Sequence, residues 1–496
     1  MKRAKRLYIL LGVLVAACAG AYGVLKYEER KEQISNSEEV VLQIPAEDVT
    51  GLSWEYEGEQ LAFHKNDGWT YDEDEAFPVS EDAIDSLLEV FREFSVSFII
   101  EDVEDYGQYG LEEPVCTIQV ETEEETYDIQ LGDYSTMDSQ RYVSIGDGNV
   151  YLVQEDPLDS FDAVLSDMIE NDETPSFGSA QVQQVQFAGA QEYQLEYQED
   201  STDTYCADDV YFTERDKENR PLDTDLVDSY LNSISNLSLT DYVTYNATGE
   251  ELASYGLDDP ELTVTVQYTP KDDEDTEENE AVEQTFVLNI SRDPEKAPAA
   301  EEAEEENGGQ GDGDFQESDS ENDNSENDDS GDSGEITAYV RVGESPIVYR
   351  LTADDYRTLT AAAYDDLRHQ EVFTGDFGDI TQIDISLEEQ EYSITTREED
   401  DETTYFYGDE ELEIGEFKSA LAALTADSFT DQEPSDKEEI GLTLHLDNET
   451  YPQVTVELYR YDGSSCLAVV DGEPVCLVER SYVVDLIEAV NAIVLN

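Results

Sequence analysis

The chain has 496 residues, which is enough for about three domains of roughly 150 residues each. Its 124 acidic and 25 basic residues give a formal net charge of −99, which excludes nucleic acid as a natural partner because phosphate binding needs a basic face. The same charge argues against docking of the soluble part on anionic lipid, and it attracts cations only loosely. A halophilic origin would produce a similar balance, so the composition leaves that origin open.

The first residues depart from this acidic pattern. A basic start, MKRAKR, precedes nineteen residues without a charge at 7–25. At about 1.5 Å per residue this segment nearly spans a hydrocarbon core. Basic residues before it place the N-terminus in the cytoplasm and the bulk of the chain outside. We therefore expect residues 1–38 to be a cytoplasmic start and a single-pass anchor in the cell membrane.

Two alternatives for this segment stay open. A cleaved signal peptide has a similar pattern. The sequence VAAC at 15–18 resembles a bacterial lipobox, which would make Cys18 a lipidated first residue, although the apolar run continues past it. All three interpretations place the acidic bulk outside the cytoplasm.

The rest of the chain repeats one pattern three times, which predicts modules at 39–177, 178–375 and 376–496. Each copy opens with alternating strands, as in half-buried antiparallel hairpins, at 49–65, 182–198 and 380–396. A strand, a second hairpin and a closing helix follow later in each copy. The expected fold is α+β, with an antiparallel sheet and helices in every module and with the third module degenerate.

A helix is predicted after each opening hairpin, at 78–94, 221–237 and 413–429. Ser80 is the expected N-cap of the first helix, and Asp223 or Thr224 that of the second. Apolar residues three and four positions apart form a stripe that faces a core: Ile84, Leu87, Leu88 and Phe91; Leu226, Tyr230, Leu231 and Ile234; Phe417, Leu421 and Leu424.

The second module carries an acidic insertion at about 293–335, composed of Glu, Asp, Asn, Ser and Gly. It has almost nothing to bury and should be disordered. Its spacing fits no EF-hand loop, which needs acids at alternate positions, a fixed Gly and a distal Glu. We expect loose association of cations with this insertion and no built metal site.

The motif YGLEEP at 109–114 returns as YGLDDP at 255–260, with a remnant, IGL, at 440–442. Gly110 and Gly256 are expected just past a helix end, where the backbone turns left-handed. The Leu after each Gly then packs back on the helix, and the Pro prevents the helix from resuming. The motif is therefore interpreted as a helix stop formed by Gly110, Leu111, Pro114, Gly256, Leu257 and Pro260.

The acids inside the motif are an alternative catalytic pair. Such a pair needs an environment that separates the two pKa values, and the sequence around Glu112 and Glu113 supplies none. The third copy also lacks these acids. The structural interpretation is therefore favoured, with the acids in an exposed turn.

The charged start, the single apolar span, an early GW at 68–69, YGL-x-x-P and the later YVSI…VYLV together resemble the bacterial DUF4340 family, a domain of unknown function. The resemblance covers nearly all of the chain after the anchor and is weak in the third copy. It implies an envelope protein, often associated with gliding-motility-type ABC transporter systems as an auxiliary subunit. It brings no catalytic residues.

Motifs for hydrolases, zinc enzymes and nucleotide binding are missing: the sequence has no H-E-x-x-H, C-x-x-C, G-x-S-x-G or Walker loop. The three histidines, His64, His369 and His445, lie in different copies at different positions. Carboxylates are so abundant that a glycosidase pair is neither excluded nor identifiable. No catalytic, cofactor-binding or metal-binding residue is therefore predicted.

Two cysteines in the last hairpin allow a disulfide. Cys466 and Cys476 match Tyr339 and Tyr349 of the second copy when the hairpins are aligned. Facing strand positions bring Cβ atoms near disulfide range, and an extracytoplasmic location permits the bond. The alternative is that both cysteines are small core residues without a bond. A shift of one residue in the strand register decides between the disulfide and this alternative.

These features predict a non-enzymatic, membrane-anchored extracytoplasmic accessory or scaffolding protein, beside permease or ATPase subunits of an ABC transporter. One alternative is an envelope glycan hydrolase that uses a carboxylate pair. Another is a passive acidic spacer protein at the surface.

Overall fold

A computed structural model describes residues 39–494, except 102, 179–180, 200, 271–281, 297–335, 400–401 and 436. The expected anchor at 7–25, Cys18 and most of the acidic insertion at 293–335 lie outside the described residues. Within the described part of the chain, no helix is long and apolar enough to cross a membrane.

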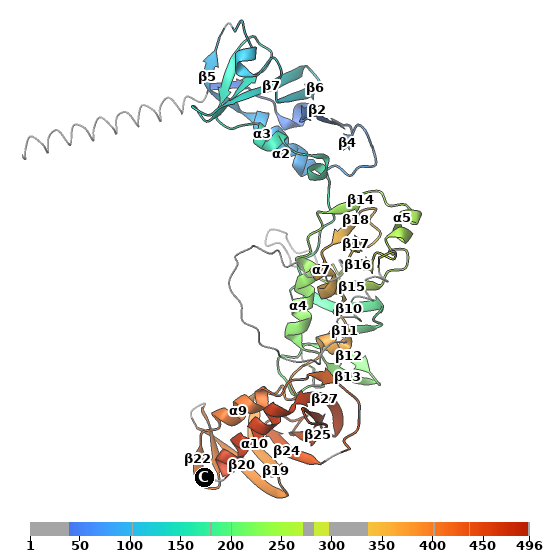
Figure 1. Ribbon diagram of the computed structural model, residues 1–496, viewed down its shortest axis with the longest axis vertical. Coiled ribbons are helices and arrows are strands. Elements are labelled where there is room, and N and C mark those ends of the chain that lie inside the picture. The colour runs from blue at the N-terminus through green and yellow to red at the C-terminus, as the bar shows by residue number, and fades with distance from the viewer. Residues whose placement is uncertain are drawn as a thin grey trace, which may run out of the picture. The chain divides into compact units, whose positions relative to one another are not determined.

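The chain divides into two compact units, Met1–Asp172 and Glu173–Asn496. The first unit contains the sheet of module one, and the second contains the sheets of modules two and three (Figure 1). Thr174 donates a hydrogen bond to the carbonyl oxygen of Ser235, and Phe177 packs on Tyr268, so these residues belong to module two. The boundary expected after residue 177 therefore lies earlier, after Asp172.

Module one is a nine-stranded antiparallel sheet with helices on one side (Figure 1). Ser80 caps the first long helix by accepting from the amide of Ala83, as predicted. All four predicted stripe residues of this helix are buried. The elements are β1 Glu39–Leu42, β2 Val49–Tyr56, β3 Glu59–Lys65, β4 Trp69–Tyr71, α2 Glu81–Arg92, β5 Phe94–Ile100, the 3₁₀ turn η2 Gly107–Tyr109, β6 Cys116–Thr122, β7 Thr126–Ser135, β8 Gln140–Ser144, β9 Val150–Val153, α3 Leu158–Phe161 and η3 Leu165–Met168.

Module two is a second nine-stranded sheet. Asp223 caps its long helix, and Val227 takes the buried place that the sequence assigned to Leu226, which is only half-buried. The elements are β10 Val182–Gly189, β11 Tyr193–Tyr197, β12 Tyr211–Arg215, β13 Glu218–Pro221, α4 Thr224–Ser235, β14 Tyr242–Thr244, α5 Gly249–Ser254, β15 Leu262–Tyr268, β16 Gln284–Arg292, β17 Ala338–Val342, β18 Val348–Leu351, α7 Ala353–Thr360 and α8 Tyr364–Leu367.

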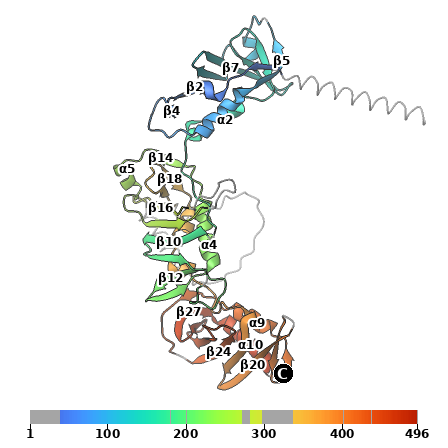
Figure 2. The ribbon, with the colours of Figure 1, turned by 180° about the vertical axis from the view of Figure 1, so that it is seen from behind.

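Module three is a third nine-stranded sheet, on which α9 and α10 lie side by side (Figure 2). Phe417, Leu421 and Leu424 are buried as expected, although the helix ends before Leu424. The elements are η5 Phe377–Asp379, β19 Ile380–Leu387, β20 Gln390–Glu399, β21 Glu402–Tyr407, β22 Glu410–Leu412, α9 Gly415–Ala422, β23 Ser428–Phe429, β24 Glu438–Leu446, β25 Gln453–Arg460, β26 Ser465–Val470, β27 Glu473–Glu479 and α10 Arg480–Val494.

Eight strands follow one topology in all three sheets. The orders are β4-β3-β2-β6-β7-β8-β9-β5, β12-β11-β10-β15-β16-β17-β18-β14 and β21-β20-β19-β24-β25-β26-β27-β23. The strand after the long helix, β5, β14 or β23, therefore always pairs with the last strand of a four-stranded meander. An irregularity in register also recurs at the start of β2, β10 and β19, where each pairs with the first meander strand. These similar sheets support the prediction of tandem modules.

Candidate functional site

The YGL motif ends a helical turn in modules one and two. Gly110 and Gly256 have φ angles of 71° and 72°, in the left-handed region. The amide of Leu111 donates to the carbonyl of Tyr106 over 3.1 Å, and that of Leu257 to the carbonyl of Leu252 over 2.8 Å. Each Gly amide donates to the carbonyl three residues before it, which completes a Schellman motif. The preceding turn is α-helical in module two but a 3₁₀ turn in module one.

The side chains of the motif serve packing. Leu111 and Leu257 are buried, whereas the four acids of the two motifs are exposed. The motif tyrosines pack on the second hairpin: the ring centroid of Tyr109 lies 5.0 Å from that of Tyr142, and the equivalent pair in module two lies 4.7 Å apart. Pro114 and Pro260 precede β6 and β15. The motif therefore fixes the entry into the meander.

The remnant IGL in module three has a different structure. Ile440 and Gly441 lie inside β24, where they pair with both β19 and β25. The strand begins at Glu438, before the remnant. Without a helix before it, a Gly-Leu sequence has no helix end to cap. IGL therefore shares residue types with the motif but does not form a helix stop.

The structure does not contain the predicted disulfide, because Cys466 and Cys476 are both free. Cys466 lies opposite Val478 and Cys476 lies opposite Ala468, so the two thiols are diagonal neighbours. Diagonal positions are about 7–8 Å apart, beyond the Cβ separation of about 3.5–4.5 Å that a disulfide needs.

The alignment of the hairpins explains the error. Tyr349 lies opposite Val340 in module two, in the place that Cys476 takes opposite Ala468. The residue of module two that is equivalent to Cys466 is therefore Ala338 and not Tyr339, one residue away from the sequence alignment.

We expect thiol counting on the denatured chain to give the same number with and without reductant. Burial raises the pKa of Cys466 to about 11 and that of Cys476 to about 12, so both remain protonated at neutral pH and react slowly with oxidants. Two additional thiols after reduction, mapped to these residues by mass spectrometry, would contradict the register described above.

An arginine–carboxylate pair recurs at one end of each sheet. Glu261 stands one residue before the residue of β15 that pairs with the last residue of β10. In the same way, Glu439 stands one residue before the residue of β24 that pairs with the last residue of β19. Arg292 lies 3.2 Å from Glu261, and Arg480 lies 3.2 Å from Glu439. In a chain with only 25 basic residues, these arginines hold the end of a strand close to the closing helix.

Module one forms the equivalent pair with other residues. Val115 occupies the place of the glutamate, and Arg141 on β8 instead donates to Asp156 over 2.6 Å and to the carbonyl of Gly132 over 2.7 Å. Asp156 also accepts from the amide of Leu158 at the start of α3. The pair is more buried here than in the other modules, with side chains 10% and 12% exposed.

Each of the three histidines contacts an aspartate, but their surroundings differ. His64 and His445 lie on strands β3 and β24 and contact Asp72 and Asp384 on partly exposed sheet surfaces. His369 lies in the segment after α8 and contacts two aspartates. It is the only one of the three that belongs to a larger group of potential ligands among the described residues.

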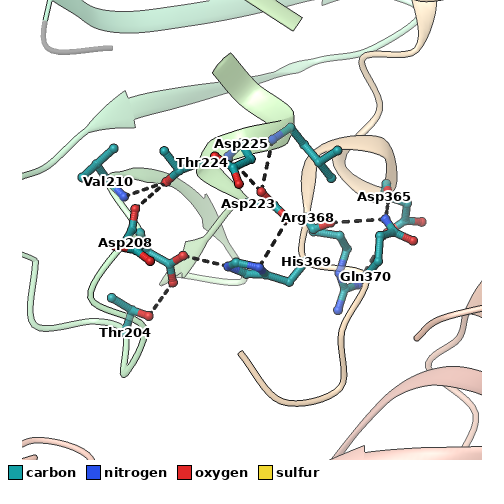
Figure 3. Close-up of polar contacts among 12 residues, drawn as sticks. Thr204, Asp208, Val210, Asp223, Thr224, Asp225, Asp365, Arg368, His369 and Gln370 are labelled. Atoms are coloured by element: carbon teal, nitrogen blue, oxygen red, sulfur yellow. Dashed lines mark hydrogen bonds and ion pairs between the residues drawn. The ribbon is translucent and has the colours of Figure 1, made fainter. Parts of the chain in front are cut away.

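We call His369, Asp209, Asp223 and Glu371 the His369 cluster. Figure 3 labels two of its members, His369 and Asp223. The Nε2 atom of His369 lies 2.7 Å from Oδ1 of Asp209, whose side chain is 2% exposed. The Nδ1 atom lies 3.6 Å from Oδ2 of Asp223. Thr204 donates its hydroxyl to the second oxygen of Asp209, which fixes that carboxylate.

The protonation of His369 depends on this environment. Burial alone would lower the pKa of His369, but the hydrogen bond and the charge of Asp209, with the charges of Asp223 and Glu371, raise it above its usual value. Nothing in the sequence pointed to this cluster, because Asp209 and His369 are 160 positions apart.

The cluster lies beside the contact between modules two and three, within the second compact unit. Tyr205 of module two stacks on Phe373 and meets Tyr451 edge to face. The backbone of residues 370–372 is hydrogen-bonded to residues 424–426 of module three. Arg220 forms an ion pair with Glu473 over 2.9 Å.

The DUF4340 family model, described as a domain of unknown function, matches residues 69–260. This part of the chain is similar to the DUF4340 family. The match begins in β4 and ends at the proline of the second YGL motif, so it joins the larger part of module one to the first half of module two. It covers less of the chain than the sequence resemblance suggested. The chain matches no curated protein and no solved structure.

Proposed function

We propose that the chain is a non-enzymatic, membrane-anchored extracytoplasmic accessory protein whose three modules form a binding or scaffolding arm, beside an ABC transporter. The observation that carries the proposal is the repetition of one sheet topology three times. The recurring features of the modules, which are the YGL turn and the arginine–carboxylate pairs, all serve to hold strands and helices together. Modules that repeat features of structural stabilisation are suited to a protein that presents binding surfaces to partner proteins.

Module one is the expected partner-binding module. Among the described residues, it holds six of the nine exposed large hydrophobic side chains: Val40, Phe98, Val115, Tyr134, Met137 and Val164. Phe98 is 60% exposed and Met137 is 90% exposed. In a strongly acidic chain, exposed apolar side chains on one module favour contact with another protein there.

The alternative of a glycan hydrolase gains no support from the cavity beside Glu261. That cavity of about 370 Å³ is lined by Glu261, Arg292, Tyr356 and Asp366 among others. Both oxygens of Glu261 lie 3.0 Å from the hydroxyl of Tyr356, and Oε2 also accepts from Arg292. Glu261 therefore acts as a structural carboxylate.

The test is crosslinking in native membranes, followed by detergent extraction, purification through a C-terminal tag and mass spectrometry. We expect a permease or ATPase subunit to co-purify in a stoichiometric amount. A photoreactive amino acid at Phe98 or Met137 should capture that subunit, whereas the same probe at Tyr461 of module three, which is 39% exposed, should not. Recovery of the chain alone, with all three probes uncrosslinked, would refute the accessory function.

A further inference from the structure

We propose that the His369 cluster binds one divalent transition-metal ion of the zinc class, with Asp223, His369 and Glu371 as ligands. One potential ligand atom from each of these three residues lies within 4.8 Å of the others. The three residues come from the start of α4 and from the segment that leads to module three. The site is distinct from the acidic insertion, where cation association is expected to be loose.

The spacing of the ligand atoms of the two half-buried residues fits a shared ion. Nδ1 of His369 and Oδ2 of Asp223 are 3.6 Å apart, which is too long for a hydrogen bond between them. Ligand bonds of about 2.0–2.1 Å in a tetrahedral zinc site place neighbouring ligand atoms roughly 3.3 Å apart. A small adjustment therefore makes both atoms ligands of one ion.

The other oxygen of Asp223 is already in use. Its Oδ1 atom accepts from the amides of Asp225 and Leu226 as the N-cap of α4. This arrangement holds the carboxylate in place and leaves Oδ2 directed to His369, as Figure 3 shows. The helix start thus orients the ligand before any ion arrives.

Asp209 supplies the second-sphere contact that metal-bound histidines usually have. A ligating imidazole commonly donates its other N–H to a carboxylate, which fixes the tautomer and the orientation of the ring. Nε2 of His369 lies 2.7 Å from the buried Asp209, so Nδ1, which faces Asp223, is the nitrogen left to bind an ion. Thr204 holds Asp209 in turn.

The set of ligands selects the class of metal. One imidazole and two carboxylates suit zinc and its neighbours, whereas calcium and magnesium prefer oxygen ligands alone. Glu371 is exposed, so its side chain is free to turn toward the ion and water can complete the coordination. Three carboxylates around a single imidazole also provide the negative charge that a dication would balance.

Metal binding would stiffen the contact between modules two and three. Gln370 and Val372, on either side of Glu371, are hydrogen-bonded to Ala426 and Leu424 of module three. An ion held by Glu371, His369 and Asp223 therefore ties this segment to the start of α4.

The experiment is isothermal titration of the full-length, chelator-treated chain with zinc chloride in excess magnesium, which occupies non-specific carboxylate sites. We expect one saturable zinc site. Glu371→Gln, at an exposed position, should keep the fold and weaken zinc binding at least about tenfold, and Asp209→Asn should weaken it about 10–100-fold. The matched control Glu192→Gln, also exposed and in module two, should leave affinity unchanged.

A second measurement guards against variants that fail to fold. Nitrogen-detected NMR of the three histidines should show one imidazole shifting on zinc addition, and that signal should be missing in His369→Gln. Equal zinc affinity in Glu371→Gln and the unmodified chain, or a shift at His64 or His445 instead, would overturn the proposal.

Discussion

Replacing Arg141 with methionine is expected to destabilise module one by about 3–5 kcal/mol, because removing one partner leaves a buried carboxylate uncompensated. Asp156 is 12% exposed and would lose a bond of 2.6 Å, and the carbonyl of Gly132 would lose its donor. Methionine keeps most of the side-chain volume, so the effect reports the lost polar contacts and not a cavity.

The chain provides a local reporter for this experiment. Its only two tryptophans, Trp54 and Trp69, are both buried in module one. Tryptophan fluorescence during urea unfolding of the full-length chain therefore follows module one alone, which avoids a two-state assumption for the whole protein.

A matched control separates a buried pair from an exposed one. Arg92 pairs with Glu89 on α2 in the same module, but both side chains are more than half exposed. Arg92→Met should shift the free energy of unfolding by less than about 1 kcal/mol. If the two variants unfold at the same urea concentration, the Arg141 pair does not have the role assigned to it.

The second large effect is expected for Gly110→Ala, at about 2–4 kcal/mol of destabilisation of module one. Part of the cost is the left-handed backbone at φ 71°, which a Cβ disfavours. The rest is steric, because a Cβ at this position would lie 2.7 Å from the backbone nitrogen of Asp133 on β7. The same fluorescence measurement detects the change.

Gly58 offers the control for this substitution. It has a φ of 87° in the turn between β2 and β3, and no atom lies within 4 Å of the position of an added Cβ. Gly58→Ala should therefore cost only the backbone strain, roughly 1–2 kcal/mol. A cost for Gly110→Ala no greater than this would show that the close approach of β7 is unimportant.

Much of the architecture follows from local patterns. The opening hairpins were predictable because side chains alternate between the two faces of a strand. The stripe of α2 and its cap at Ser80 were predictable because a helix repeats every 3.6 residues and begins with a capping residue. The stop at Gly256 was predictable because only glycine adopts the left-handed conformation without strain.

The shift at Leu226 shows where the helix pattern fails. Leu226 and Val227 are adjacent apolar residues on α4, and either could face the core by periodicity alone. The direction in which the sheet of module two lies relative to the helix decides that Val227 is buried.

Register was not predictable to the residue. The period of two along a strand constrains which face a side chain occupies but not which residue lies opposite, and a turn that differs by one residue moves every pair. Cys466 therefore faces Val478, and the alignment that placed it with Tyr339 was off by one.

The sequence by itself determined the repeat, the kinds of elements and the role of the YGL turn, because these depend on residues a few positions apart. Only the tertiary structure decided the partners of Arg141, the separation of Cys466 from Cys476, and the meeting of His369 with Asp209 and Asp223. Such contacts join segments far apart in the chain, and their geometry is set by how the sheets pack and pair, which no local pattern encodes.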